Sequence, residues 1–174
     1  MTNKDVFCRR ASASDAVEIH RLMLKAYEGL EDKSIFVCDG LEYIQSCICG
    51  GKGFGIVACN NNNRIVGSFV LYYPFMGEDN LGRDIDLPIE ELPKVVHMES
   101  AVVMSEYRGR GLQYEMLKYA EELLDRSKYR YCLATVSPDN PASFRSLEKN
   151  GYRHITTKEK YNGLIRRIYL KEIY

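Results

Sequence analysis

A turn of alternating arginine and glycine occupies residues 108–113, between an apolar run and a segment with helical periodicity. The glycines let the backbone bend so that several amide hydrogens converge on one point, and a helix that begins there adds the positive end of its dipole. Backbone donors in this arrangement bind phosphate oxygens. We therefore predict a site for a polyanionic ligand, formed by Arg108, Gly109, Arg110, Gly111, Leu112 and Gln113.

Glu99 is the candidate for acid–base chemistry because it lies within the apolar run 95–103 that precedes this turn. Even numbers of residues separate it from Ala101 and Val103, so the alternation of a strand predicts that all three share a face. A carboxylate among apolar neighbours can take a proton from a reacting group. The alternative is a surface glutamate on a half-exposed strand, paired with Lys94 or Arg108.

His97 lies two residues before Glu99 and is expected on the same face, where it can act as a second base or as a proton relay. A histidine that is satisfied within the fold, or exposed, is the favoured alternative. The other two histidines, His20 and His154, form no ligand pair with it in the sequence.

The cysteines do not have the spacing of a zinc site, because the only close pair, Cys47 and Cys49, is separated by one residue. Four cysteines lie in or beside apolar runs, so we expect them to be reduced and buried, with no bound metal. These four are Cys8, Cys49, Cys59 and Cys132. A P-loop site is not expected either, because no lysine followed by serine or threonine ends the glycine turn.

Length and composition favour one domain with a substantial core. The 174 residues are 45% hydrophobic, and 24 basic residues balance 24 acidic ones, so no net field attracts nucleic acid or an anionic membrane. Residues 1–5 are too polar for a signal peptide, and no apolar run reaches the roughly 18 residues of a membrane span. We expect a soluble, cytoplasmic protein with a single domain over residues 1–174.

Hydrophobic periodicity predicts the elements that must position these residues. Strands are expected at 6–11, 54–59, 64–73, 95–103, 131–136, 152–155 and 164–173, and helices at 16–28, 40–49, 112–124 and 141–150. Asp39 is expected to cap the second helix, and residues 74–93 to form a loop. Alternating strands and helices of this kind predict an α/β layer fold.

This order of elements, with the glycine turn after the fourth strand, resembles the GNAT superfamily of acyl-CoA-dependent N-acetyltransferases. Residues 108–113 resemble its pyrophosphate-binding motif, and the segment from Asn140-Pro141-Ala142-Ser143 to Leu147 and Tyr152 resembles its second cofactor motif. The likeness spans nearly the whole chain. It implies a mixed, mostly antiparallel central sheet that is flanked by helices and splayed between the fourth and fifth strands, 95–103 and 131–136.

The resemblance implies acetyl-CoA as co-substrate. The amides of residues 108–113 would hold its diphosphate, and Val102 and Val103 would pair with the pantetheine arm as an added strand would. Asn140 and Ser143 would touch the same arm. Gln113 departs from the family, which usually has glycine or alanine at this position, and its side chain is expected to point outward.

The implied reaction moves an acetyl group from a thioester to a primary amine. A free alkylamine has a pKa of about 10.4 and is mostly protonated at pH 7, so a base must take a proton. Glu99 occupies the position where many members of the family carry this base. Many relatives protonate the departing thiolate with a tyrosine, but the equivalent position here is Leu147. Ser137, Tyr161, Tyr107 or water is left for that role.

Two charged segments concern the substrates. Residues 74–93 carry six acidic side chains and one arginine, and they are expected near the acceptor, where they would attract a cation. Tyr72, Tyr73 and Phe75 would then wall the acceptor pocket, and the favoured alternative is a solvated loop beside core aromatics. The basic tail from Arg145 to Tyr174, with Arg166 and Arg167 adjacent in it, either contacts the 3′-phosphate of the cofactor or, as favoured, faces solvent.

The sequence therefore predicts an N-acetyltransferase that uses acetyl-CoA and acts on an amine-bearing small molecule or peptide, without a covalent enzyme intermediate. The alternative is a non-catalytic acyl-CoA-binding or sensing domain, which is plausible because Leu147 cannot donate a proton. No nucleic-acid or membrane partner is expected, and a homodimer is left open.

Overall fold

The computed structural model describes residues 5–174, in which seven strands form one sheet in the order β1-β2-β3-β4-β5-β7-β6. Within these residues only the β4–β5 pair is parallel. The strands are β1 (Val6–Arg10), β2 (Gly53–Asn60), β3 (Ile65–Tyr72), β4 (Val95–Val103), β5 (Tyr131–Val136), β6 (Arg153–Lys160) and β7 (Leu164–Glu172). The predicted mixed, mostly antiparallel sheet is confirmed.

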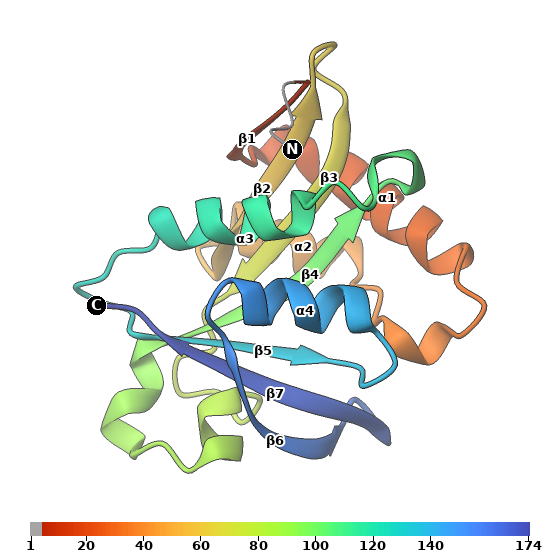
Figure 1. Cartoon of the computed structure of the whole chain (residues 1–174). Coiled ribbons are helices and arrows are strands. Elements are labelled where there is room, and N and C mark those ends of the chain that lie inside the picture. Colours follow the sequence, from red (N-terminus) through yellow and green to blue (C-terminus); the bar gives the residue numbers. More distant parts are fainter. Residues whose placement is uncertain (1–4) are drawn as a thin grey trace.

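Helices cover both faces of the sheet (Figure 1). The helices α1 (Ala16–Glu28) and α2 (Leu41–Ile48) pack on one face, and α3 (Leu112–Glu122) and α4 (Pro141–Lys149) lie on the other. Strands β2 and β3 are consequently buried along nearly their whole lengths. The helices α1 and α3 each contribute an apolar stripe at three- and four-residue intervals, as the periodicity predicts.

Strands β4 and β5 pair only near their starts. The paired positions are Val95 with Tyr131, Val96 with Cys132 and His97 with Leu133. Beyond them β4 continues to Val103 and β5 to Val136 without a shared ladder, and the two strands diverge (Figure 1). The predicted splay is confirmed. It leaves strand edges unpaired on both sides of a cleft at the centre of the sheet.

A β-bulge interrupts β4 at the position of the candidate base. Phe69 and Leu71 of β3 pair with Ala101 and Met98, so two residues of β4, Glu99 and Ser100, oppose the single residue Val70 of β3. The extra residue shifts the alternation of side chains, because each bulge adds one residue to one strand only. The spacing of two between Glu99 and Ala101 therefore does not by itself place their side chains on a common face.

Three further expectations differ from the structure. β6 runs over Arg153–Lys160 instead of 152–155, because it is a largely exposed edge strand without an apolar alternation. The expected loop contains two short 3₁₀ helices, Leu81–Ile85 and Ile89–Lys94. Among the cysteines expected to be buried, Cys59 and Cys132 are buried, Cys8 is half-buried and Cys49 is exposed.

No helix within residues 5–174 has both the length and the apolar character that crossing a membrane requires.

Candidate active site

A cleft of about 480 Å³ opens between β4 and the two helices α3 and α4. Eight of the ten residues predicted to bind the cofactor line it: Val102, Val103, Arg108, Gly109, Gly111, Leu112, Gln113 and Asn140. Ser143 lines an adjoining cavity. The Arg110 side chain does not line the cleft, because its guanidinium lies over the Tyr107 ring and donates to the Glu106 carbonyl, 3.1 Å away.

The glycine turn has the backbone conformation that its composition predicts. Gly109 and Gly111 have φ values of 74° and 78°, in the left-handed region where a side chain adds strain. Gly111 precedes α3 without a side-chain cap, and no acceptor within residues 5–174 satisfies the N–H groups of the first turn, residues 112–114. These amides and the helix dipole can bind an anion. The Arg108 amide is not among them, because it donates to the Ser105 carbonyl, 3.2 Å away.

Three cationic side chains line the same cleft: Arg108, Arg145 and Lys149. The last two come from α4, at the start of the basic tail that was expected to face solvent in preference to the cofactor phosphate. Their spacing of four residues places them on one face of a helix, which is the pattern that could have identified them. Together with the amides at the start of α3, they give the cleft a positive character suited to phosphate groups.

Gln113 points toward α4, so the expectation that it faces outward was wrong. Its Nε2 atom donates to the Ser143 hydroxyl across 3.0 Å and links the first turns of the two helices. Asn140 caps α4, as its sequence pattern predicts, because its side-chain oxygen accepts from the Ser143 amide at 3.2 Å. The two predicted cofactor motifs are therefore in direct contact.

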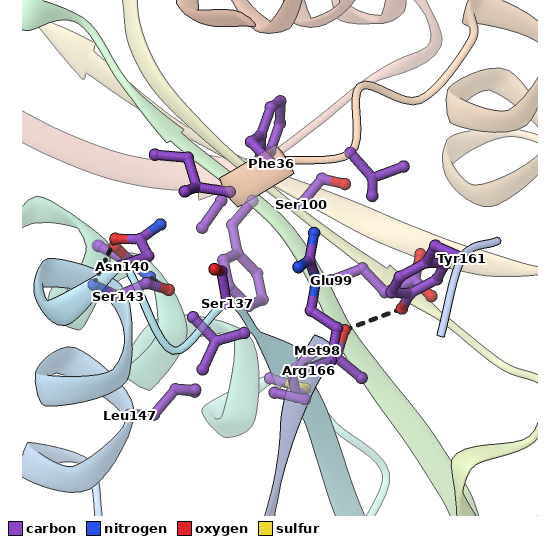
Figure 2. A pocket seen from close by; sticks show the side chains of 18 of the residues that line it. Phe36, Met98, Glu99, Ser100, Ser137, Asn140, Ser143, Leu147, Tyr161 and Arg166 are labelled. Carbon is purple, nitrogen blue, oxygen red and sulfur yellow. Dashed lines mark hydrogen bonds between the residues drawn. The ribbon is translucent and has the colours of Figure 1, made fainter. Parts of the chain in front are cut away.

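The cleft meets a smaller cavity of about 170 Å³ that lies between the splayed strands (Figure 2). Both are lined by the same five residues: Ile35, Phe36, Ala101, Gln113 and Asn140. The smaller cavity contains the polar side chains of Asp39, Glu99, Ser100, Ser137, Tyr161 and Arg166. A ligand arm that follows the cleft from α3 would therefore reach these groups at its end.

Glu99 is held in this cavity by two hydrogen-bond donors. The Tyr43 hydroxyl donates to Oε2, and Nδ1 of His97 lies 3.3 Å from Oε1. The alternative pairing with Lys94 or Arg108 is not observed, because Lys94 pairs with Glu91 at 2.6 Å and Arg108 Nε donates to the Val103 carbonyl. Glu99 is therefore a fixed carboxylate inside the cleft of the sheet.

His97 is a buried histidine with both ring nitrogens in use, as the favoured alternative predicts. The Leu81 amide donates to Nε2 across 3.0 Å, so this nitrogen carries no proton. The ring proton then lies on Nδ1 and is donated to Glu99. With 3% of its surface exposed, His97 orients the carboxylate and has no free nitrogen for a substrate.

Asp39 also faces the small cavity, and the prediction that it caps α2 was wrong. The cap is Gly40, and the Asp39 carboxylate instead accepts a hydrogen bond from the Ser100 hydroxyl. Burial raises the pKa of Asp39 to about 6, and the nearby charge of Glu99 adds to this effect, while the bond from Ser100 opposes it. Two carboxylates thus lie at the bulge in β4, Glu99 within it and Asp39 bonded to its neighbour Ser100.

The sequence matches the acetyltransferase (GNAT) family over residues 17–152, a span that includes the glycine turn, the bulged strand and α4. The chain belongs to the GNAT acetyltransferase family.

Solved structures share this fold at low sequence identity. A GCN5-related N-acetyltransferase from Kribbella flavida is 17% identical, with 99% of this chain and 100% of that chain covered and a TM-score of 0.74. NAA60 from Arabidopsis thaliana in complex with acetyl-CoA is 14% identical, with 97% and 98% covered and a TM-score of 0.72. Aminoglycoside acetyltransferase AAC(6′)-Ib in complex with coenzyme A and kanamycin is 15% identical, with 96% and 94% covered and a TM-score of 0.69. No curated protein sequence matches this chain significantly.

Leu147, at the GNAT position where relatives often carry tyrosine, is buried and lines the small cavity. Of the substitutes named from the sequence, Ser137 and Tyr161 line this cavity and Tyr107 lines the larger cleft. Ser137 Oγ accepts from the Asp139 amide at 3.2 Å, which leaves its own proton to donate. The Tyr161 hydroxyl lies 2.8 Å from Thr135 Oγ1.

The acidic segment 74–93 contributes no residue to either cavity of this GNAT domain. Asp84 in this segment is paired with Lys160 at 2.6 Å. Tyr72 and Tyr73 do not line either cavity: Tyr72 packs against His97, and Tyr73 stacks on Tyr129 with 4.4 Å between ring centroids. These residues fit the favoured alternative, a charged loop beside aromatics that pack within the fold.

Proposed function

We propose that this chain transfers an acetyl group from acetyl-CoA to a primary amine. The observation that carries the proposal is the junction of the two cavities. A cationic cleft at the start of α3 leads directly into a small cavity that contains a fixed carboxylate. This arrangement suits a long anionic carrier whose reactive end must meet a base.

The residues of the cleft fit coenzyme A. The free amides of residues 112–114 and the side chains of Arg108, Arg145 and Lys149 match the negative charge of its phosphates. The Arg108 side chain donates to the Val103 carbonyl on the unpaired edge of β4. If Arg108 turns to bind a phosphate, this oxygen becomes available to an extended ligand. The bound molecule supplies the activated acetyl group as a thioester.

Glu99 acts as the general base in this proposal. It takes a proton from the acceptor amine, whose nitrogen then forms a bond to the carbonyl carbon of the thioester. The carbon–sulfur bond breaks and coenzyme A leaves as a thiolate, while the nitrogen releases its remaining excess proton, which reaches the thiolate through Ser137, Tyr161 or water. The bonds from Tyr43 and His97 hold the carboxylate in place, so its orientation is set before the amine arrives.

The second carboxylate, Asp39, supports an amine as the acceptor. Asp39 and Glu99 together attract an ammonium group. After Glu99 has taken a proton from it, Asp39 still binds the amine. A cation close to Asp39 also offsets the unfavourable burial of its charge. The acidic groups that select an amine would thus lie at the bulge of β4 and the start of α2.

A non-catalytic acyl-CoA-binding domain is the second candidate, and the buried Leu147 at the position of the usual tyrosine favours it. Release of thiol separates the two functions. The purified chain is incubated with acetyl-CoA and a broad panel of amines, and free coenzyme A is measured. An acetyltransferase releases thiol above background with at least one amine. A binding domain shows only a higher melting temperature with the ligand and no release.

A further inference from the structure

Arg166 is a buried cation inside the small cavity, which contradicts the expectation that it faces solvent or binds the cofactor phosphate. It extends from β7, is 4% exposed, and its side chain is among those that converge on the cavity (Figure 2). It does not line the cofactor cleft. Its neighbour Arg167 is half-buried and lies over the Phe144 ring, 4.8 Å from the centroid.

The protein compensates the charge of Arg166 only in part, because its Cζ atom lies 5.8 Å from the centroid of the Tyr161 ring and Asp32 is near but does not pair with it. Its Nη2 atom donates to the Ser34 carbonyl at 2.5 Å and its Nη1 atom to the Ile165 carbonyl at 3.0 Å, and both acceptors are uncharged. Within residues 5–174 it forms no ion pair with an acidic side chain. A guanidinium stays charged and has five N–H donors, and burying such a charge without a counter-ion is unfavourable. A site of this kind is completed by an anionic ligand.

The two carboxylates of the cavity do not fill this role, because both have other partners. Glu99 is bonded to Tyr43 and His97, and Asp39 is bonded to Ser100. The phosphates of the cofactor have their own cations in the larger cleft. The counter-ion of Arg166 is therefore expected from the second substrate.

We infer that the acceptor is a small amino acid, with its carboxylate on Arg166 and its amine at Glu99 and Asp39. The inference rests on the proposed acetyl transfer. A carboxylate matches the planar fork of a guanidinium with two parallel hydrogen bonds. The cavity holds about 170 Å³, below the roughly 300–1,000 Å³ of pockets that enclose drug-sized ligands, so it suits a compact acceptor.

The test compares acceptors that differ only in the carboxylate. Glycine, alanine and glutamate are each assayed for thiol release against glycinamide, alaninamide and α-glutamamide. We expect the wild-type chain to prefer each amino acid over its amide by roughly 10- to 100-fold in kcat/KM, the range set by charge-assisted hydrogen bonds. An aminoalkyl phosphate preferred over all amino acids would overturn the carboxylate assignment.

Two variants test whether Arg166 causes the preference for amino acids over their amides. Arg166→Met is expected to remove the preference for amino acids through a higher KM and to leave the amides within about threefold of wild type. Arg167→Met, on the same strand, is the control and keeps the preference. Equal activity of wild type toward acids and amides, or an equal loss on both in Arg166→Met, would overturn the inference and leave the proposed acetyl transfer intact. Absence of thiol release with every amine would overturn both.

Discussion

Nδ1 of His97 lies 3.3 Å from the Glu99 carboxylate and donates to it. The other ring nitrogen, Nε2, accepts a hydrogen bond from the Leu81 amide. One histidine thus connects the 3₁₀ helix Leu81–Ile85 to the candidate base. Since both nitrogens are occupied, the ring serves to orient Glu99. Its two hydrogen bonds have separate consequences for activity and for stability.

Two substitutions at His97 separate those consequences. In His97→Asn the amide nitrogen approximates Nδ1, so donation to Glu99 survives and the Leu81 amide loses its acceptor. In His97→Gln the amide oxygen approximates Nε2, so the Leu81 amide keeps its acceptor and Glu99 loses its donor. We expect His97→Asn to keep kcat within about threefold and lose roughly 1–3 kcal/mol of stability, and His97→Gln to lose about tenfold in kcat.

Urea unfolding and steady-state kinetics of both His97 variants check this expectation. A role confined to stability would leave the two variants with equal kcat, and that result would contradict the orienting role.

Glu99→Gln removes the proton acceptor and keeps the shape of the side chain. General bases contribute roughly 10²–10⁴-fold, so we expect kcat to fall by about 10²-fold at pH 7. At alkaline pH more of the amine is already neutral, so the deficit should shrink. The Kd for coenzyme A should not change. Glu159→Gln, on the exposed edge strand β6, is the control. Unaltered turnover in Glu99→Gln would exclude Glu99 from the mechanism.

Gly111→Ala tests the glycine turn, and Gly51→Ala is its matched control. Both glycines have positive φ, 78° and 75°, and an added Cβ would meet nothing within 4 Å at either position. Each substitution should therefore lower stability by about 1–2 kcal/mol through backbone strain alone. Only Gly111 adjoins the cofactor cleft, so only Gly111→Ala should raise the KM for acetyl-CoA, by up to roughly tenfold. Equal KM values in both variants would argue against the turn as a phosphate site.

Asp39→Asn tests the buried carboxylate. Its pKa is about 6 in the folded protein, against about 3.9 for an aspartate in an unfolded chain, so the unfolded state gives up this proton more readily. Stability is then lost as the pH rises through 4 to 6, and the loss reaches up to about 3 kcal/mol above pH 6. Asp39→Asn should be more stable than wild type by up to this amount at pH 7.5, and by about half of it at pH 5.

Urea unfolding at both pH values measures the Asp39 effect, with the exposed Asp139→Asn as control. A variant less stable than wild type at pH 7.5 would show that the ionised carboxylate is stabilised by contacts beyond Ser100.

Local chemistry made much of the fold and the cofactor cleft predictable. The left-handed turn at Gly109 and Gly111 and the cap formed by Asn140 before Pro141 depend on neighbouring residues, so the sequence pattern identifies them. The order of strands and helices follows from periodicity for the same reason. The splay of β4 from β5 came from the family resemblance.

The interior of the small cavity was harder to predict because it depends on contacts between distant elements. The bulge at Glu99 adds one residue that alternation does not register. Asp39 precedes a helix and so has the pattern of a cap, but Ser100, 61 positions away, is its partner. Arg166 has the sequence pattern of a solvent-facing charge. An arginine on a strand gives the same pattern whether its guanidinium faces water or enters a cavity.

Titration calorimetry with coenzyme A tests most directly whether the start of α3 holds the diphosphate of the cofactor. We predict association with a Kd well below 1 mM for coenzyme A, and at least tenfold weaker binding of pantetheine, which lacks the diphosphate. Absence of binding at millimolar coenzyme A, or equal binding of the two molecules, would contradict the assignment.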